Sequence, residues 1–362
     1  MRIVHYYGPA LSGEFGTAIA VRGWCRALAE AGTEVALAAD TERGTIRPPP
    51  GVEVIPAGSA WVGRPLPQTL RTGLAGADLV VLHGGWDPRN LPVARQAGRL
   101  DVPYIVTAHG VYHPEIFRRR KPIAKRVWWS LLERRHLSGA LAVHVFFEEE
   151  TEHLSARGIR TPAIVVPNGY AAPIDVHRLG NRDGYLIWLG RFAPFHKGLD
   201  LLLHAVQLLP PRDRPRLRLV GVDWRGRRKV VARLVRRLGL EQHVSVEGPL
   251  HGDAKWEALA GARGFVYPSR WEAFGVAVAE AVSIGVPTLV TPFPLGRFLA
   301  SRGGAILSLP QPKALAEGLM RLTDAGADGI GRRGAEVVRE HLSWDRVASS
   351  WLQQVEDLLR GS

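Results

Sequence analysis

Two carboxylates in the second half of the chain have the spacing to bind a ligand that carries hydroxyl groups and phosphate. Glu272 comes just before a helical pattern, and Glu280 follows about two turns later on an otherwise apolar helix. A carboxylate in that setting needs partners, and the two vicinal hydroxyls of a ribose would satisfy both oxygens of Glu280. The backbone N–H groups of Phe274, Gly275 and Val276 point out of the first helical turn. Phosphates and sugar hydroxyls bind to such unpaired N–H groups. In the alternative interpretation, Glu272 caps the helix and Glu280 pairs with an arginine.

Two cations lie in an earlier loop of the same kind. Arg191 and Lys197 stand six residues apart, between an apolar run at residues 185–189 and a helical pattern at residues 199–209. Cations with this spacing can hold a diphosphate and stabilise the charge that it gains as a leaving group. The alternative is a pair of solvated loop charges.

The elements that position these residues alternate along most of the chain. Short continuous apolar runs are separated by longer helical segments, which is the pattern of parallel sheets covered on both faces. The expected strands are residues 2–7, 34–39, 52–55, 78–82, 104–108, 140–145, 163–166, 185–189, 216–220, 244–247, 264–267, 287–290 and 305–307. Expected helices include residues 19–31, 199–209, 229–238 and 312–323.

The alternation stops and restarts at residues 171–183, a stretch that contains Pro173 and Gly180. We therefore expect an α/β protein of two doubly wound, Rossmann-like domains that face each other across a cleft, with the linker in this stretch. The length of 362 residues also suggests about two domains. Ligands of such sheets bind outside the carboxyl ends of the strands, where both charged loops stand.

Composition narrows the class of protein. A hydrophobic fraction of 46% with 22% charged residues is typical of a globular chain, and no apolar run reaches the ~18 residues that span a bilayer. The apolar stretch at the start is too short for a signal peptide. The single cysteine, Cys25, cannot form an internal disulfide. These features favour a cytoplasmic protein.

The net charge of +13 should attract phosphates, nucleic acid or anionic lipid. The basic segment from Arg118 to Trp129 interleaves cations with Ile123, Val127 and Trp128, a composition suited to an anionic membrane surface. This segment predicts a peripheral position on the inner face of the cell membrane. The alternative is a solvated face with the tryptophan pair in the core. No nucleic-acid recognition module accompanies the charge, so we expect no nucleic-acid partner.

The two charged loops together resemble those of the retaining glycosyltransferases of family 4, which have the two-domain GT-B fold. That family carries a Gly-Arg…Lys-Gly loop followed by a Glu-x7-Glu segment. The matching residues here are Gly190-Arg191, Lys197-Gly198, Glu272 and Glu280. The resemblance implies that Arg191 and Lys197 hold the donor diphosphate. It also implies that Glu272, with the following backbone, holds the donor sugar and that Glu280 takes the ribose hydroxyls.

The resemblance extends over nearly the whole chain. Residues 219–221, 238–240 and 246–248 match segments on the base side of the donor. The ending Ser343-Trp344-Asp345-Arg346-Val347 resembles a terminal helix that crosses back to the first domain. The expected parts are an acceptor-side domain at residues 1–172, a nucleotide-sugar-binding domain at residues 173–342 and the returning helix at residues 343–362.

The first domain matches the family less closely. Gly16 corresponds to a glycine beside the donor phosphates, but Phe15 stands where a second glycine is usual. His109, in Thr-Ala-His-Gly, matches a strand-end histidine that contacts the transferred sugar. Asn168 belongs to a matching Pro-Asn-Gly. Arg297 stands in the segment that replaces a Gly-Gly-x-x-Glu loop, where it would supply a phosphate contact.

The resemblance implies retaining transfer of a hexose-type sugar from a UDP- or GDP-sugar to a hydroxyl acceptor, a cell-envelope glycan or lipid or a small metabolite. Substitution would be front-face, with the donor's own phosphate oxygen accepting the acceptor's proton. No cofactor and no metal is expected, because cations replace an Asp-x-Asp metal site. The expected catalytic residues are His109, Glu272, Arg191 and Lys197. The expected donor-binding residues are Gly16, Arg191, Lys197, Glu272, Phe274, Gly275, Val276 and Glu280.

Other classes of protein stay open from the sequence. A nucleotide-sugar epimerase on the same fold would turn over its substrate without an acceptor. A sugar phosphorylase of the glycogen type would need a lysine-bound pyridoxal phosphate. A nucleic-acid binder rests on the net charge alone and would show steeply salt-dependent binding.

Overall fold

The computed structural model describes residues 1–8, 16–40, 48–58, 60–119, 122–171, 183–324 and 326–361. The chain divides into two compact units. Unit 1 comprises Met1–Gly169 and Leu342–Ser362, and unit 2 comprises Tyr170–His341. Most of the expected linker, residues 172–182, lies outside the described residues, and so does Phe15.

Within the described residues, unit 1 is built on a seven-stranded parallel sheet. The first strand lies near its centre, and the chain winds outward from it in both directions. The spatial order is β3 (Val52–Pro56), β2 (Glu34–Ala39), β1 (Arg2–Tyr7), β4 (Leu79–His83), β5 (Tyr104–Thr107), β6 (Ala142–Val145) and β7 (Ala163–Val165).

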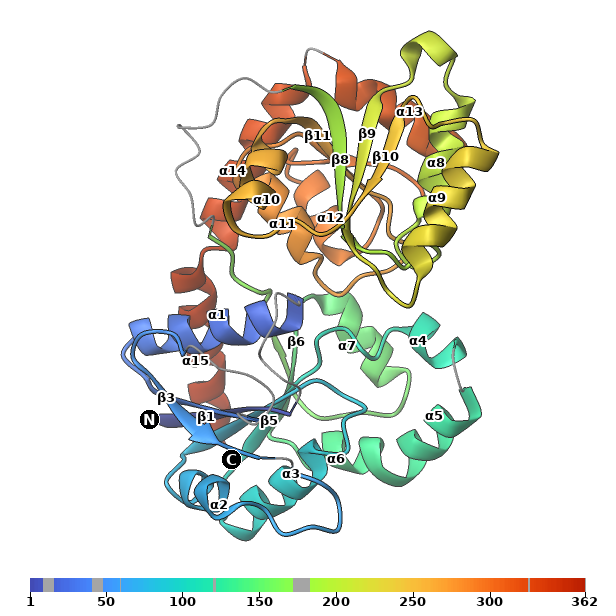
Figure 1. The fold of residues 1–362 in the computed structure, drawn as a ribbon. Coiled ribbons are helices and arrows are strands. Elements are labelled where there is room, and N and C mark those ends of the chain that lie inside the picture. The colour runs from blue at the N-terminus through green and yellow to red at the C-terminus, as the bar shows by residue number, and fades with distance from the viewer. Residues whose placement is uncertain are drawn as a thin grey trace. The chain divides into compact units, whose positions relative to one another are not determined.

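Both faces of this sheet are covered, which explains why its strands are apolar throughout. Side chains alternate along β1, so that Val4 and Tyr6 enter one apolar core and Ile3 and Tyr7 enter the other. Helices α2 (Gln68–Ala75) and α3 (Asn90–Arg99) cover one face, and α1 (Gly16–Glu30) and α15 (Trp344–Arg360) cover the other (Figure 1). The other helical segments of unit 1 are α4 (Pro114–Arg118), α5 (Pro122–Trp128), the π-helical η1 (Trp129–Glu133), α6 (Arg134–Ser138) and α7 (Glu148–Ser155).

The last helix, α15, is held in unit 1 by tryptophans. A Cβ atom added at Gly23 would lie 2.1 Å from the Trp344 ring, so glycine is needed for the helices to approach. The Trp24 ring meets the rings of Trp344 and Trp351 at centroid distances of 5.5 and 6.1 Å. Trp24 Nε1 also donates to Asn168 Oδ1 at 2.8 Å. The asparagine of the Pro-Asn-Gly segment therefore has a structural partner within unit 1.

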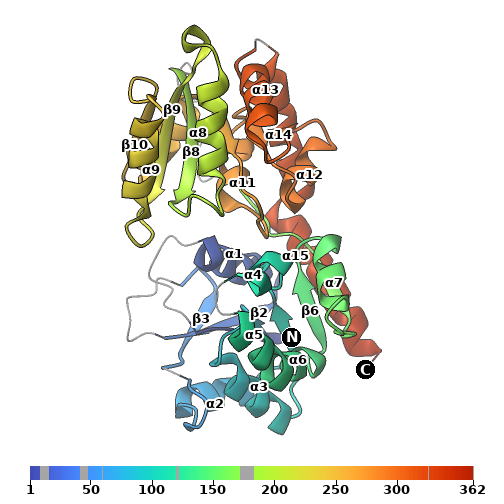
Figure 2. The same cartoon turned by 90° about the vertical axis from the view of Figure 1, so that its right-hand side faces the viewer.

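Within the described residues, unit 2 holds a six-stranded parallel sheet. Its spatial order is β10 (Val244–Glu247), β9 (Arg216–Val222), β8 (Asp183–Arg191), β11 (Ala262–Tyr267), β12 (Thr288–Val290) and β13 (Ile306–Leu307). Helices α8 (Leu199–Leu208) and α9 (Arg227–Arg237) lie on one side of β8 in Figure 1, and α10 (Gly252–Ala260) and α11 (Val276–Ser283) on the other. Figure 2 shows α13 (Pro312–Thr323) beside α14 (Ala327–His341). The short elements are η3 (Pro211–Asp213) and α12 (Pro294–Ala300).

Each strand expected from the sequence is present, with its ends shifted by at most two residues. The α/β class with two doubly wound parallel sheets is confirmed. In each sheet the strand order reverses beside the first strand, between β1 and β4 and between β8 and β11. The loops that leave the carboxyl ends of strands at such a point form the usual ligand crevice.

Candidate functional site

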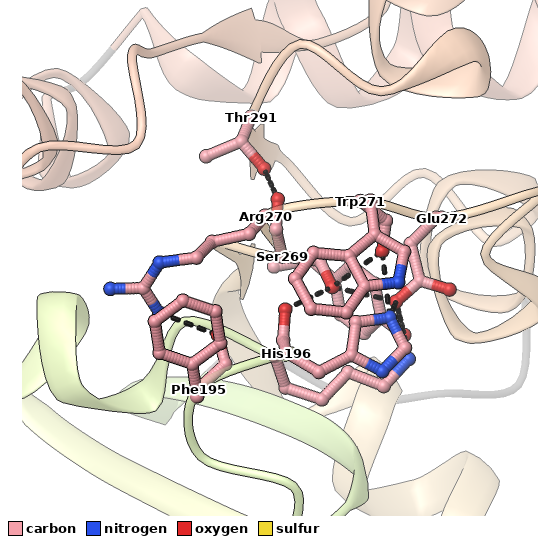
Figure 3. A network of polar contacts seen from close by, with 9 residues as sticks. Phe195, His196, Ser269, Arg270, Trp271, Glu272 and Thr291 are labelled. Carbon is pink, nitrogen blue, oxygen red and sulfur yellow. Dashed lines mark hydrogen bonds and ion pairs between the residues drawn. The ribbon is translucent and has the colours of Figure 1, made fainter. Parts of the chain in front are cut away.

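The loops after β8 and β11 meet at Lys197 and Glu272. Lys197 Nζ pairs with Glu272 Oε1 and donates to the Tyr267 hydroxyl oxygen 2.7 Å away. Ser269 Oγ donates to Glu272 Oε1 at 2.6 Å, and the Tyr267 hydroxyl donates to the same oxygen at 3.3 Å. Donors from two neighbouring strand ends thus converge on one carboxylate oxygen; Figure 3 shows the Ser269 and Glu272 side.

The two oxygens of Glu272 have different surroundings. Every hydrogen bond that the described residues give to this carboxylate ends on Oε1. The side chain is 11% exposed. Glu272 is therefore fixed through one oxygen and presents the other, Oε2, for a ligand.

Buried charge is balanced within this cluster. Burial raises the pKa of Glu272, but the charge of Lys197, the nearby His196 and the hydrogen bonds together bring that pKa below its usual value. The group is therefore a carboxylate at neutral pH. Burial lowers the pKa of His196 to about 4, although Glu272 favours its charged form. The neutral His196 ring stacks on Trp271 at 4.4 Å between centroids, and its Nε2 donates to the Trp271 carbonyl oxygen at 2.8 Å (Figure 3).

The backbone fixes the loop that carries Lys197. Gly198 has φ +63°, and a Cβ atom there would lie 1.8 Å from the carbonyl oxygen of Pro268. Only glycine allows the two loops to cross at this distance. Beside the crossing, Arg270 forms a two-pronged pair with Asp200, with both distances 2.7 Å. The loops are thus locked together before any ligand arrives.

Arg191 lies within electrostatic reach of this pair. It is the last residue of β8, and its guanidinium stacks over the Trp224 ring at 4.4 Å from the centroid. Burial and Glu272 raise the pKa of Tyr267, and the charge of Arg191 opposes that rise. Arg191 therefore acts electrostatically on Tyr267, the same tyrosine that Lys197 contacts directly.

Helix α11 begins at Val276, directly after the Glu272 loop. Gly275 is its N-cap residue, in a left-handed conformation with φ +84°, and has no side chain to cap the first turn. Among the described residues, Glu272 accepts hydrogen bonds from Lys197, Tyr267 and Ser269 and not from this helix, so the interpretation in which it caps α11 is wrong. The positive end of the helix dipole faces the loop that carries Glu272. Phe274 is buried, with 3% of its surface exposed.

Glu280 belongs to the same polar cluster. It is 7% exposed, and Lys255 Nζ from α10 lies 2.9 Å from its Oε1. The alternative interpretation paired Glu280 with an arginine, whereas this ion pair is formed with a lysine. Burial raises the pKa of Tyr170, and the charge of Glu280 adds to that rise. Glu280 also acts on Tyr267, which joins it to the Lys197–Glu272 pair.

The remaining expected residues are placed as follows. Gly16 is the exposed first residue of α1. His109 follows β5 with φ +50°, and its Nε2 lies 3.0 Å from Nδ1 of His83. Arg297 donates to the carbonyl oxygen of Pro292, five residues earlier. Gly16 and His109 belong to unit 1, whereas the other expected residues belong to unit 2.

Sequence reasoning missed three side chains that position the expected ones. These are His196, Tyr267 and Ser269. Their signal in the sequence was their place at the carboxyl ends of apolar strands, where polar side chains line a ligand crevice. Their partners were not readable, because each contact joins residues from separate segments.

Comparison with known families matches both halves of the chain. The model described as glycosyl transferases group 1 matches residues 183–325. The model described as glycosyl transferase 4-like domain matches residues 15–169. The first range falls in unit 2 and the second in unit 1.

Curated relatives agree with these matches. The GDP-mannose:cellobiosyl-diphosphopolyprenol alpha-mannosyltransferase of Xanthomonas campestris is 25% identical over 304 residues, which cover 80% of this chain and 77% of that protein. The O-antigen chain mannosyltransferase B of Escherichia coli is 37% identical over 108 residues, 30% of this chain. The chain matches only 28% of the length of that enzyme.

Solved structures share the fold over its full length. Sucrose-phosphate synthase from Thermosynechococcus elongatus has a TM-score of 0.76 at 21% identity and covers all of both chains. The Anabaena protein HepE in complex with UDP-glucose has a TM-score of 0.74 at 17% identity, over 99% of this chain and 100% of that one. The matches to both units, together with this shared fold, show that the chain belongs to the group 1 glycosyltransferase family and has the GT-B fold.

Proposed function

We propose that the chain transfers a hexose, with retention of configuration, from a nucleoside-diphosphate sugar to a hydroxyl acceptor. One observation carries this proposal. Glu272 is a buried carboxylate fixed through Oε1, with Oε2 presented beside the uncapped start of α11. Such an arrangement can accept hydrogen bonds from sugar hydroxyls while helix N–H groups bind the diphosphate. The relatives support the donor class, since one is named for GDP-mannose and a structural neighbour holds UDP-glucose.

Each charged residue has a role in this proposal. The Lys197 ammonium has three donors; Glu272 and Tyr267 take two in the described structure, which leaves one for a phosphate oxygen. Arg191 offers a planar fork for the same diphosphate. Glu280 accepts hydrogen bonds from the ribose hydroxyls of the donor.

The proposed reaction needs neither a protein nucleophile nor a metal. The bond from sugar C1 to the diphosphate oxygen breaks while a bond from the acceptor oxygen to C1 forms on the same face. The acceptor proton passes to the departing phosphate oxygen, so a nucleoside diphosphate is released. Lys197 and Arg191 stabilise the negative charge that develops on it. In this proposal His109, whose pKa burial lowers to about 3, contacts a hydroxyl of the transferred sugar as a neutral ring.

Ligand-induced stabilisation tests the proposal directly. We expect a nucleoside diphosphate with one preferred base to raise the melting temperature by several degrees, because a ligand at 100 times its Kd adds about 2.7 kcal/mol of stability. The corresponding nucleoside monophosphate is the control, since it lacks the second phosphate. A nucleotide sugar that carries the same base should then release its nucleoside diphosphate in a coupled assay.

The outcomes separate the alternatives. Conversion of the nucleotide sugar to another sugar isomer without diphosphate release would identify an epimerase. If no UDP-, GDP-, ADP-, CDP- or TDP-linked compound shifts the melting temperature or is turned over, the proposal fails.

We further propose that unit 1 rests on an anionic membrane surface through the helical segment at residues 122–138, which comprises α5, η1 and α6 (Figure 2). Ile123, Val127 and Leu131 are spaced at four residues and are 74%, 52% and 59% exposed. They form an apolar stripe. The exposed arginines beside it are Arg118, Arg126, Arg134 and Arg135, and this charge selects an anionic lipid surface as the occupant.

The two tryptophans of this segment lie inward, as in the alternative interpretation that placed the pair in the core. Trp129 is 9% exposed and packs edge-on against Tyr112 and Phe117. Trp128 Nε1 donates to the buried Glu133 at 2.7 Å. The aromatic pair therefore anchors the helix, and the aliphatic stripe makes the contact with lipid. Within the described residues, no helix combines the length and the apolarity needed to cross a bilayer.

Vesicle binding tests this surface. We expect the protein to sediment with vesicles that contain anionic phosphatidylglycerol and not with phosphatidylcholine alone. Ile123→Asp/Leu131→Asp should lower the partition coefficient more than about 10-fold, because each buried aliphatic side chain contributes about 1.5–3 kcal/mol. The matched control is Leu208→Asp, at a site 61% exposed in unit 2. Equal binding to both kinds of vesicle, or an unaffected double variant, would contradict the proposal.

A further inference from the structure

Three histidines of unit 1 form one hydrogen-bonded row across the centre of its sheet. His5 lies on β1, His83 ends β4, and His109 follows β5. His5 Nδ1 lies 2.9 Å from His83 Nε2, and His83 Nδ1 lies 3.0 Å from His109 Nε2. His5 and His83 are 1% and 2% exposed, whereas His109 is partly exposed. The row therefore leads from the core of the sheet to its carboxyl edge.

Each of these rings carries a single N–H at neutral pH. Burial lowers the pKa of His5 and His109 to about 3 and that of His83 well below its usual value. A neutral imidazole has one donor nitrogen and one acceptor nitrogen. His83 is hydrogen-bonded through both nitrogens. The position of its one proton therefore decides in which direction the hydrogen bonds of the whole row are donated.

Only two proton arrangements satisfy both hydrogen bonds. In the first, His5 Nδ1 donates to His83, and His83 Nδ1 donates to His109 Nε2. In the second, every ring carries its proton on Nε2 and the donation runs the other way. The second arrangement would put an N–H on His5 Nε2, a buried atom that has no hydrogen-bond partner in the described structure. Among backbone groups, buried N–H donors without an acceptor are rarer than carbonyls without a donor, and we apply the same order to the two ring nitrogens.

We infer that His83, with His5 behind it, is a positioning residue that keeps the proton of His109 on Nδ1. The outer ring then has its Nε2 occupied as an acceptor and offers Nδ1–H as a donor to a ligand. Which nitrogen of a histidine carries the proton is commonly set by the bond that the other nitrogen makes. The inference deepens the proposed function in one respect, since it makes His109 a donor toward a hydroxyl or phosphate oxygen of the nucleotide sugar.

The backbone around His109 supports a built site at this end of the row. His109 and Gly110 both have positive φ, at +50° and +70°. A histidine in that conformation is uncommon and costs free energy that the surroundings must supply. The buried carboxyl of Glu150 is one such support: burial raises its pKa to about 7, and the backbone N–H groups of Phe146, Phe147 and Gly110 bond to it.

Nuclear magnetic resonance of ¹⁵N-histidine-labelled full chain tests the tautomer without any substrate. We expect His109, identified by the signal lost in His109→Asn, to show a protonated Nδ1 and a bare Nε2. In His83→Leu, which removes the donor, the proton should move toward Nε2. In His83→Asn, whose amide can still donate from nearly the same place, Nδ1 should stay protonated. His136→Phe is the control, because the His136 ring makes no hydrogen bond in the described structure.

Kinetics with the nucleotide sugar give a second readout. We expect His83→Leu to lower kcat roughly 10-fold and His83→Asn to keep it within about 3-fold, with little change in KM for the acceptor. A protonated Nε2 on His109 in the wild-type chain, or the same tautomer in His83→Leu, would overturn the inference. If the wild-type chain turns over no nucleotide sugar, the proposed function fails, and the resonance experiment still decides the tautomer.

Discussion

Replacing Glu272 by glutamine should lower transfer and donor hydrolysis by about 10²- to 10³-fold, the usual effect of removing one group that is aligned with the transition state. The glutamine side chain keeps an acceptor oxygen for Ser269 and Tyr267, but an NH2 group takes the place of the presented Oε2. This nitrogen cannot accept the two hydrogen bonds from the donor sugar. Lys197→Met should have an effect of similar size, because it removes a charge from the departing diphosphate. For each variant, release of nucleoside diphosphate with acceptor measures transfer, and release without acceptor measures donor hydrolysis.

Stability must be separated from activity in this experiment. Breaking a buried ion pair costs roughly 3–5 kcal/mol, whereas removing both partners is often nearly neutral. We therefore expect each single variant to melt at a lower temperature and Lys197→Met/Glu272→Gln to recover much of the loss while staying inactive. Glu34→Gln is the control, since it removes a paired carboxylate at the amino end of a strand of unit 1. A folded double variant with turnover within about 3-fold of the wild type would remove this pair from the mechanism.

Acidification should unfold unit 1 between about pH 6.5 and 4. Burial is the main cause that lowers the pKa of several of its histidines, among them the five residues His5, His83, His109, His136 and His144. Their usual pKa is 6.5, so the unfolded chain binds more protons than the folded chain below that pH. By linkage, stability is then lost as the pH falls and is fully present above 6.5.

The expected loss is large. One pH unit below 6.5, each such histidine removes about 1.4 kcal/mol from the free energy of unfolding, so five remove up to about 7 kcal/mol. Glu150 acts in the opposite direction: its pKa, raised by burial to about 7, makes the folded chain bind the extra proton in this window. It offsets the contribution of about one histidine. Since whole domains are stable by only about 5–15 kcal/mol, the transition should fall within the window.

Chemical unfolding followed at half-unit steps from pH 8 to pH 4.5 measures this dependence. His136→Phe isolates one contribution, because the His136 ring stacks on Tyr104 at 5.5 Å and makes no hydrogen bond in the described structure. We expect this variant to be more stable than the wild type at pH 5.5 and to have a shallower slope by about 1.4 kcal/mol per pH unit. A free energy of unfolding that is constant between pH 7.5 and pH 5 would contradict the prediction.

The proposed membrane-binding segment shows which features a local sequence pattern predicts and which are decided by packing. The sequence predicted a segment from Arg118 to Trp129 that mixes cations with apolar residues, and the structure forms helix α5 there. The sequence left open whether Trp128 and Trp129 lie at the lipid surface or in the core, and in the structure both rings turn inward, onto Glu133 and an aromatic cluster. Which apolar side chains of a helix face solvent depends on what the rest of the fold supplies to pack against them. The exposed stripe at Ile123 and Leu131 was visible only in three dimensions.

The sequence by itself determined the strands, the two sheets and the loops that carry Arg191, Lys197 and Glu272, because strand and helix periodicity depend on residues that are close along the chain. Only the tertiary structure decided that Lys197 meets Glu272 and that His5, His83 and His109 stand in a row. Both results follow from strand order, which places β8 beside β11 and β1 beside β4 and β4 beside β5. Strand order is fixed by packing between distant segments, so no local pattern records it.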